Sequence, residues 1–312
     1  MARDRELILT NLKEALKSKN LHQRDLAALL GKNEAEVSRW LSGRVGIGYA
    51  NIERINKALE TDITRPNKQD RANKQKTVGI ILAAGQSSKR DTPILYTNIQ
   101  GKPVLAYTIE LYQNHPDIDA IEVVASRNHL DQIRELVRAY NYDKVKWVCQ
   151  GGATYQDSVF NAIQNLEGEI DDNDTVAIHF GASPFTSDKI ITDAINVCRE
   201  KGNAFSVIPC YQLMGNNDVP GESTQWVDRD KIIQLACPQC FGFRYIQHLY
   251  EEAAERNLLS KVEPHTVSLM YLMGHTVYTS YGDQTNIKIT THEDLDIFEG
   301  FVLLKNYRKQ LK

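Results

Sequence analysis

The stretch from residue 77 to residue 181 alternates short apolar runs with helical patterns, and this alternation constrains the fold most. Four apolar runs that end in small residues predict buried strands: "TVGIILAAG" (77–85), "AIEVVAS" (120–126), "VKWVCQGG" (145–152) and "DTVAIHFG" (174–181). Helical patterns separate them, for example "LDQIRELVRAY" (130–140). Strands alternating with helices predict a doubly wound α/β domain with a mostly parallel, Rossmann-like sheet. Because such sheets bind ligands at the carboxyl ends of their strands, we expect a ligand site at "AAG", "GG" and "HFG".

A chain of 312 residues suits two unequal domains, and the first 64 residues have a different pattern. Short amphipathic helices follow one another there, with Leu26, Leu29 and Leu30 expected on one apolar stripe. Gly31 permits a sharp turn, and Asn33 is a candidate N-cap with Glu36 in the capping-box position. We therefore predict a small all-α domain over 1–64, an exposed polar linker over 65–76, and the α/β domain over 77–312.

The segment 5–63 resembles the lambda-repressor/Cro type of helix-turn-helix. The residues that carry the resemblance are "QRDLAALLG", "VSRWLSGR" and "IERINKALE". The resemblance implies that the second helix of the pair reads the DNA major groove and that neighbouring side chains contact phosphates. The candidate DNA-binding residues are Gln23, Arg24, Asn33, Glu34, Glu36, Ser38, Arg39 and Arg44. The alternative is a helical bundle used for protein contacts, because the leucines and Trp40 serve either role.

The charge distribution favours DNA as the partner of the small domain. Residues 1–76 hold 16 Lys and Arg against 10 Asp and Glu, a net charge of +6. The rest of the chain holds 37 − 16 = 21 basic and 40 − 10 = 30 acidic residues, a net charge of −9. A basic head on an acidic body is typical of a chain whose head alone meets a polyanion.

The remaining composition excludes several classes of protein. No apolar run reaches the roughly 18 residues of a membrane helix, and the first residues lack the apolar core of a signal peptide. We therefore expect a cytoplasmic protein with no membrane partner. Cys237 and Cys240 form a lone C-x-x-C without a second ligand pair, so we expect two half-buried thiols and no metal site, with a redox pair as the alternative.

The large domain resembles the CTP-using cytidylyltransferases of 2-C-methyl-D-erythritol 4-phosphate and ribitol 5-phosphate. Six pieces occur in the family's order: "LAAGQSSKR", "PILY", "GGATYQDSV", "HFGASPF", "VDRDKIIQLACPQCF" and "NIKITTHEDL". The resemblance implies nucleotide binding by Leu82, Ala83, Ala84, Gly85, Gly151, Gly152, Ser158 and Gly181. It also implies phosphate or substrate binding by Lys89, Arg90, Arg229 and Lys288.

Charged positions of the family pattern carry uncharged residues in this chain. Ile94 stands where the family's lysine contacts the triphosphate, Phe180 stands for an acid, and Ser183 and Tyr155 stand for arginines. Nucleotidyl transfer depends on positioning and charge stabilisation, and losing one well-placed cation costs on the order of 100- to 1,000-fold. We therefore predict that the nucleotide pocket is kept and that catalysis is weak or lost.

Three hypotheses follow for the whole chain. The favoured one is a transcription regulator whose N-terminal domain binds an operator with two-fold symmetry and whose large domain dimerises and senses a cytidine nucleotide or a phosphorylated polyol. The resemblance implies a dimer arm near Met214 to Trp226. The second is an active cytidylyltransferase using CTP and Mg²⁺, in which Lys89, Arg90 or Lys102 replaces the missing lysine. The third is a large domain that serves only as a dimerisation scaffold.

Overall fold

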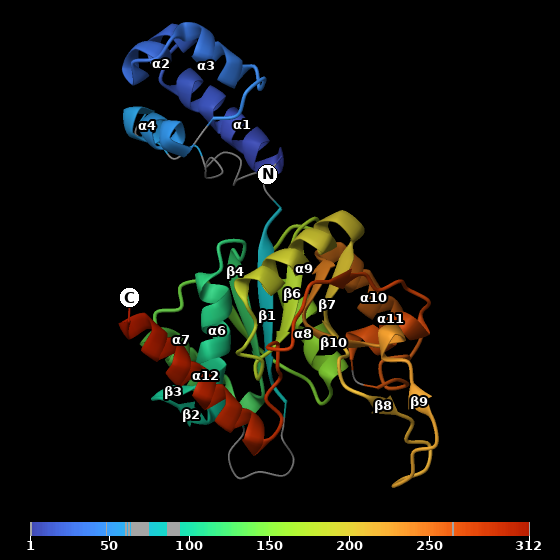
Figure 1. Cartoon of the computed structure of the whole chain (residues 1–312). Coiled ribbons are helices and arrows are strands. Elements are labelled where there is room, and N and C mark those ends of the chain that lie inside the picture. The colour runs from blue at the N-terminus through green and yellow to red at the C-terminus, as the bar shows by residue number, and fades with distance from the viewer. Residues whose placement is uncertain are drawn as a thin grey trace. The chain divides into compact units, whose positions relative to one another are not determined.

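The structure is a computed structural model, and it describes residues 2–47, 49–59, 61, 63, 75–85, 94–263 and 265–311. The side chains of residues 2–7, 49 and 50 are outside this description. The chain divides into two compact units, residues 1–74 and 75–312 (Figure 1). Most of the predicted linker falls outside the described residues, and each unit is considered by itself below.

Unit 1 is the predicted helical domain. It contains α1 (Ala2–Ser18), α2 (Gln23–Leu30), α3 (Glu34–Leu41) and α4 (Tyr49–Leu59). Every helix contributes to one core, in which Leu12, Leu26, Val37 and Ile55 are fully buried. Amphipathic helices this short depend on such mutual burial rather than on intrinsic propensity.

Local signals set the ends of α2 and α3. Gly31 ends α2 with φ of 61°, and the Asn33 side chain caps α3 by accepting the Ala35 N–H at 2.8 Å. Glu36 does not complete the predicted capping box, because its carboxylate accepts from Lys32 Nζ at 3.1 Å. The prediction for Leu29 was also wrong: it is 55% exposed, because the other helices pack against the side of α2 that carries Leu26, Ala27 and Leu30.

Unit 2 is built on a seven-stranded, mostly parallel sheet, as predicted. The strand order is β11-β7-β10-β6-β1-β4-β5, and β10 alone runs antiparallel to its neighbours. The strands are β1 (Thr77–Ala83), β4 (Ala120–Ala125), β5 (Val145–Gln150), β6 (Thr175–Phe180), β7 (Asn203–Pro209), β10 (Ile233–Gly242) and β11 (Thr279–Ser280).

Helices cover both faces of this sheet (Figure 1). One core contains side chains of α6 (Val104–Asn114), α7 (Leu130–Ala139) and α9 (Asp188–Lys201). The other contains side chains of α8 (Tyr155–Leu166), α10 (Phe243–Glu255) and α11 (Thr266–Leu272). Successive β1 residues alternate between the two cores, which explains the continuous apolar run of this central strand.

Smaller elements extend from this framework. Two hairpins are formed by β2 (Asn98–Ile99) with β3 (Lys102–Pro103) and by β8 (Met214–Gly215) with β9 (Trp226–Val227). Single 3-10 turns occur at Ile94–Tyr96, Arg127–His129 and Arg229–Lys231. The last helix, α12 (His292–Gln310), begins with a capping box between Thr291 and Asp294.

Candidate functional site: a nucleotide-type cavity and a helix-turn-helix

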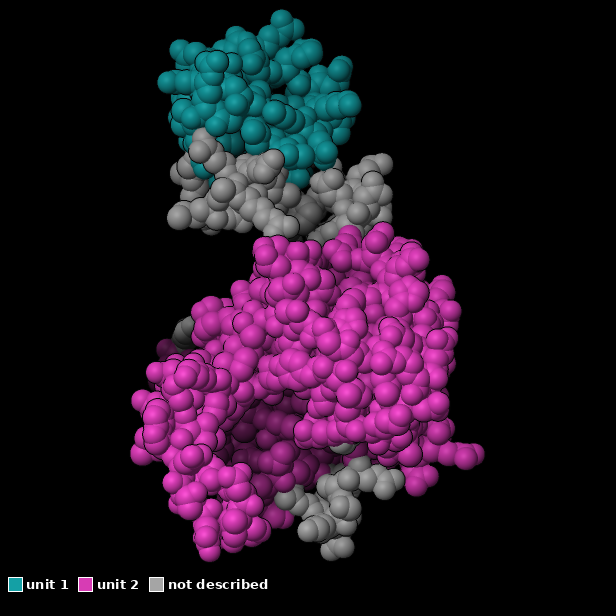
Figure 2. Space-filling view, turned by 90° about the vertical axis from the view of Figure 1, so that its right-hand side faces the viewer, with its two compact units in different colours: residues 1–74 teal, residues 75–312 magenta. Residues whose placement is uncertain are grey.

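A cavity of about 860 Å³ lies where the strands β1, β5 and β6 end. The surface of unit 2 is visibly hollowed in the space-filling view (Figure 2). Of the eight residues predicted to bind a nucleotide, seven line the cavity: Leu82, Ala84, Gly85, Gly151, Gly152, Ser158 and Gly181. Ala83 does not, because alternation along β1 turns its side chain into the core under α6.

Close packing explains the glycines after β5. A Cβ on Gly151 would lie 2.5 Å from Ala84 Cβ, and one on Gly152 would lie 2.1 Å from Asp157 Cβ. Ser158 fixes the same turn, because its Oγ accepts the Gly152 N–H at 3.1 Å and donates to the Thr154 carbonyl at 2.8 Å. The turn leads into the N-terminus of α8, which lies at the cavity and favours negative charge there.

Two cationic side chains line the described part of the cavity. Lys288 was predicted to bind phosphate or substrate, and it lines the cavity. Neighbouring protein atoms displace water from its ammonium group, and this desolvation lowers the pKa of Lys288. Its Nζ lies 4.1 Å from the centroid of the Phe180 ring, which is a cation–π distance. The second is Arg127, which sequence reasoning missed. Its place two residues after β4 was the available signal, since loops at strand carboxyl ends line such sites.

Of the other predicted phosphate ligands, the structure describes Arg229 alone, and it is not brought to this cavity. Arg229 is absent from its lining and donates through Nη1 to the Tyr211 carbonyl at 2.6 Å, so it belongs to the arm that carries β8 and β9. Lys89 and Arg90 lie outside the described residues.

An aromatic wall occupies the cavity where the family pattern has charges. Tyr155, Phe180 and His265 all line it, with ring centroids 5.2 to 6.2 Å apart. Burial lowers the pKa of His265 and raises that of Tyr155, so both side chains are neutral at pH 7. His265 was not foreseen, because no motif of the sequence includes it.

Ile94 and Ser183, the other two departures, have different environments. Ile94 lines the cavity but is only 9% exposed, because its side chain also packs in the apolar cluster of Ile289 and Phe298. Ser183 is 1% exposed and does not line the cavity. A change at Ser183 would therefore act inside the protein rather than on a bound ligand.

The described part of the cavity lining provides none of the carboxylate ligands that Mg²⁺ prefers. Mg²⁺ prefers carboxylate oxygens together with phosphate oxygens, and none of the described lining residues is Asp or Glu. Within the described ranges, no group of three or more His, Cys, Asp and Glu side chains is placed to hold a metal ion. Phe180, at the family's acidic position, instead faces the Lys288 ammonium.

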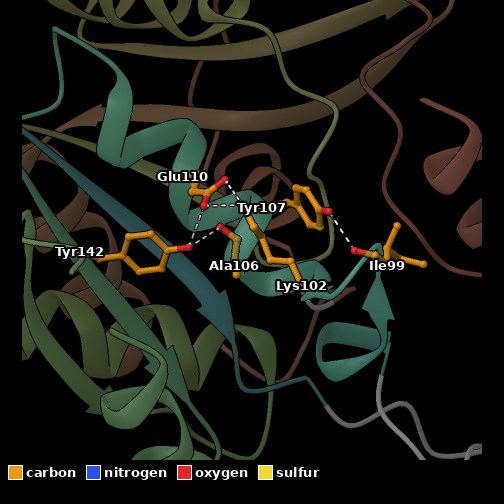
Figure 3. A network of polar contacts seen from close by, with 6 residues as sticks. All are labelled: Ile99, Lys102, Ala106, Tyr107, Glu110 and Tyr142. Carbon is orange, nitrogen blue, oxygen red and sulfur yellow. Dashed lines mark hydrogen bonds and ion pairs between the residues drawn. The ribbon is translucent and has the colours of Figure 1, made fainter. Parts of the chain in front are cut away.

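Lys102 cannot take the role of the missing lysine as it stands. Its Nζ donates to both carboxylate oxygens of Glu110, at 2.6 and 2.7 Å, and the residue does not line the cavity (Figure 3). Tyr142 donates to the same carboxylate at 3.2 Å, and Tyr107 lies under the ammonium at 4.8 Å. This network anchors β3 to α6, which is a structural role.

The C-x-x-C pair is buried more deeply than predicted. Cys237 and Cys240 are free thiols in β10, 3% and 0% exposed. Cys237 Sγ lies 3.7 Å from Nε2 of the buried His179. Neither thiol is placed to meet a partner at the surface.

In unit 1, α2 and α3 present the predicted DNA-contact residues with unequal exposure. Gln23, Arg24, Asn33, Glu34, Arg39 and Arg44 are exposed, whereas Glu36 and Ser38 are half-buried. Gln23 Nε2 donates to Glu34 Oε1 at 2.8 Å, which links the first residues of the two helices. Among the described residues, the Arg39 side chain bonds to its own helix, through Nε and the Ala35 carbonyl at 3.3 Å, and the residue is exposed.

Comparison with known proteins agrees with both units. Residues 77–304 match the family model of 2-C-methyl-D-erythritol 4-phosphate cytidylyltransferase, and residues 12–65 match a helix-turn-helix model. A ribitol-5-phosphate cytidylyltransferase from Lacticaseibacillus paracasei is 30% identical, over 72% of this chain and 96% of that protein. A 2-C-methyl-D-erythritol 4-phosphate cytidylyltransferase from Clostridium tetani is 34% identical, over 73% and 90%.

Solved structures give the same result for the fold. The 4-diphosphocytidyl-2C-methyl-D-erythritol synthase of Anaerococcus prevotii superposes with a TM-score of 0.62 at 24% identity, over 73% of this chain and 96% of that one. The Francisella tularensis 2-C-methyl-D-erythritol 4-phosphate cytidylyltransferase gives 0.58 at 27% identity, over 72% and 98%.

The helix-turn-helix unit is additional to these relatives. They align over nearly their whole length with about three quarters of this chain, so they have no room for a counterpart of unit 1.

None of the described helices is both long and apolar enough to cross a membrane. The chain therefore belongs to the 2-C-methyl-D-erythritol 4-phosphate cytidylyltransferase family and carries a helix-turn-helix domain in front of the family's domain.

Proposed function

We propose that the protein is a DNA-binding transcription regulator whose large domain binds a cytidine nucleotide or a phosphorylated polyol as a signal, with little or no catalysis. The cavity wall carries the proposal. The glycine turns that approach a nucleotide are kept, whereas Phe180 and Tyr155 form an uncharged wall at two charged positions of the family pattern. The same chain carries a helix-turn-helix, so ligand binding to the large domain can change the affinity of the protein for DNA.

The chemistry of the lining favours binding without a metal. Arg127, Lys288 and the N-terminus of α8 attract an anion, and no described lining residue is a carboxylate that would hold Mg²⁺. Chelation by Mg²⁺ removes charge from CTP, so a cationic cavity of this kind prefers the metal-free nucleotide.

The arm between β7 and β10 supports a homodimer. Five large apolar side chains on it are exposed: Tyr211 (63%), Leu213 (94%), Met214 (38%), Val219 (54%) and Trp226 (79%). Exposed apolar surface of this extent is typical of a protein interface. A dimer would supply two helix-turn-helix heads, which suits an operator with two-fold symmetry.

The competing function is CTP-dependent cytidylyl transfer to a sugar-alcohol phosphate, which the named relatives favour. Lys102 is bound to Glu110 and does not support it, which leaves Lys89 and Arg90 as replacement cations. The third possibility, a large domain that serves only as a scaffold, does not explain why the glycine turns around the cavity are kept.

Calorimetric titration and a turnover assay separate the three functions. The regulator should bind CTP, bind it more weakly when Mg²⁺ is added, and release no pyrophosphate with ribitol 5-phosphate or methylerythritol phosphate. Pyrophosphate release at about 1 per second or faster, an ordinary enzymatic rate, would establish the enzyme instead. If neither CTP nor either polyol phosphate binds, the scaffold function would be the one that remains.

A further inference from the structure

The C-terminal helix α12 exposes an apolar face that the described part of the domain contacts at Phe301, whose ring centroid lies 5.3 Å from that of Phe185. Leu295, Phe298 and Val302 lie on its inner side and pack against the cluster around Ile94 and Phe185. Its outer side carries five large apolar residues that are 38% to 59% exposed, Ile297, Phe301, Leu303, Leu304 and Tyr307, and Leu311, 69% exposed, follows at the C-terminal cap. A surface helix is normally polar on this side. The outer side of α12 is therefore a candidate interface.

The spacing of these residues is that of a helix-packing seam. Ile297, Phe301, Leu304 and Leu311 follow one another at intervals of four, three and seven residues, which is a heptad pattern with Arg308 at the seam position between Leu304 and Leu311. Gly300 lies beside this seam, and a Cβ there would meet nothing within 4 Å. Glycine inside a helix costs about 1 kcal/mol relative to alanine, and close approach of another helix would explain its presence.

The charges of α12 indicate what the seam fits. The first half of the helix holds only acidic charges, at Glu293, Asp294, Asp296 and Glu299, and the second half holds only basic ones, at Lys305, Arg308 and Lys309. The helix dipole favours this order at the two ends, but it does not account for the apolar seam between them. A second α12 lying antiparallel would place its basic half over the acidic half of the first.

We propose that α12 is a self-association surface that packs antiparallel against α12 of a second copy about a two-fold axis between Phe301 and Leu304. In that register, Phe301 of each copy faces Leu304 of the other, and each Tyr307 covers the bare backbone at the opposite Gly300. The contact is isologous, so one helix face serves both copies.

This surface is separate from the arm. Figure 1 shows α12 and the β8–β9 hairpin at opposite sides of unit 2. If both surfaces are used, the two different two-fold contacts join dimers into a tetramer with four DNA-binding heads when their axes intersect at right angles, and into an open chain when they do not. The proposal does not depend on which ligand the cavity binds.

The test is the mass of the full-length protein by sedimentation velocity over a range of concentrations. Leu304→Glu places a charge in the seam and should halve the assembled mass, or raise the dissociation constant at least tenfold. Asn306→Glu is the matched control, because it adds the same charge at an exposed position of α12 outside the seam. Arg308→Glu should weaken association less, and by an amount that falls as salt is added.

Melting curves and CTP titration of each variant show that unit 2 remains folded, which separates this test from the proposed function. The proposal is overturned if folded Leu304→Glu has the wild-type mass at every concentration.

Discussion

Replacing Ile94 by lysine tests the assignment of the cavity directly. Ile94 occupies the position of the family's triphosphate-binding lysine, and it both lines the cavity and packs against Ile289 and Phe298. A lysine there can keep its aliphatic stem in the cluster and extend its ammonium group into the cavity. Ile94→Lys should therefore lose some stability and gain affinity for CTP.

Both effects can be estimated. Removing a buried isoleucine side chain costs about 2–5 kcal/mol, and the lysine stem recovers part of this, so we expect a loss of about 2 kcal/mol. For a domain of this size that lowers the Tm by about 4–8 °C. A hydrogen bond to a charged group contributes about 1.5–3 kcal/mol, which corresponds to roughly tenfold tighter CTP binding or more.

Calorimetric titration with CTP and a thermal melt give both quantities. Ile94→Met is the matched control, because it changes the packing without adding charge and should leave the CTP affinity unchanged. A folded Ile94→Lys protein with wild-type CTP affinity would refute our placement of Ile94 at the phosphates. So would a protein that does not fold, since Ile94 would then belong to the core alone.

Further changes to the cavity, the sheet and the helix-turn-helix give three more expected results. Gly151→Ala would place a Cβ 2.5 Å from Ala84 Cβ and should weaken CTP binding at least tenfold, whereas Gly242→Ala, whose Cβ meets nothing closer than 4.0 Å, should not; equal affinities would separate the Gly151 turn from the nucleotide. Burial raises the pKa of Glu122 from 4.5 to about 8, against hydrogen bonds from Cys149 and Asn165 that lower it. The wild-type free energy of unfolding should thus fall between pH 4.5 and pH 8, and Glu122→Gln should remove that fall in pH-dependent melts; parallel curves for the two proteins would contradict the raised pKa. Arg39→Ala should reduce discrimination between the upstream region and random DNA in a gel-shift assay, while Arg134→Ala in unit 2 should not; unchanged discrimination would remove Arg39 from base reading.

The rest of the family's charge pattern cannot be restored by simple substitution. Ser183 is 1% exposed, so Ser183→Arg would put a long cation into the interior and is expected to unfold the domain. The family pattern alone suggests a triple change at positions 94, 180 and 183. With Ser183 buried, Ile94→Lys combined with Phe180→Asp is the more suitable variant for recovering activity.

The parallel sheet and the helix-turn-helix were predictable because both depend on local patterns. The apolar run of β1 and the Gly31 turn before Asn33 are properties of neighbouring residues, and the structure places them as predicted. The glycine turns after β5 were predictable for the same reason. Each of these features requires only a few consecutive residues to be correct.

Features made by residues distant in sequence were not predictable. The wall of Tyr155, Phe180 and His265 brings together three separate segments, and only packing shows that they meet. Arg229 has the right motif but lies on the arm, and Lys102 is held by Glu110 eight residues along the chain. The exposure of Leu29 depended on where α2 meets the other helices, which spacing alone did not fix.

The most direct test of the regulator is the affinity of the full-length protein for DNA from its own upstream region, measured with and without saturating CTP or polyol phosphate. We predict salt-dependent, sequence-selective binding whose dissociation constant changes at least fivefold with one of these ligands, the lower end of ordinary allosteric coupling. Binding that no ligand alters, or no preference for that DNA over random sequence, would contradict the proposed regulator.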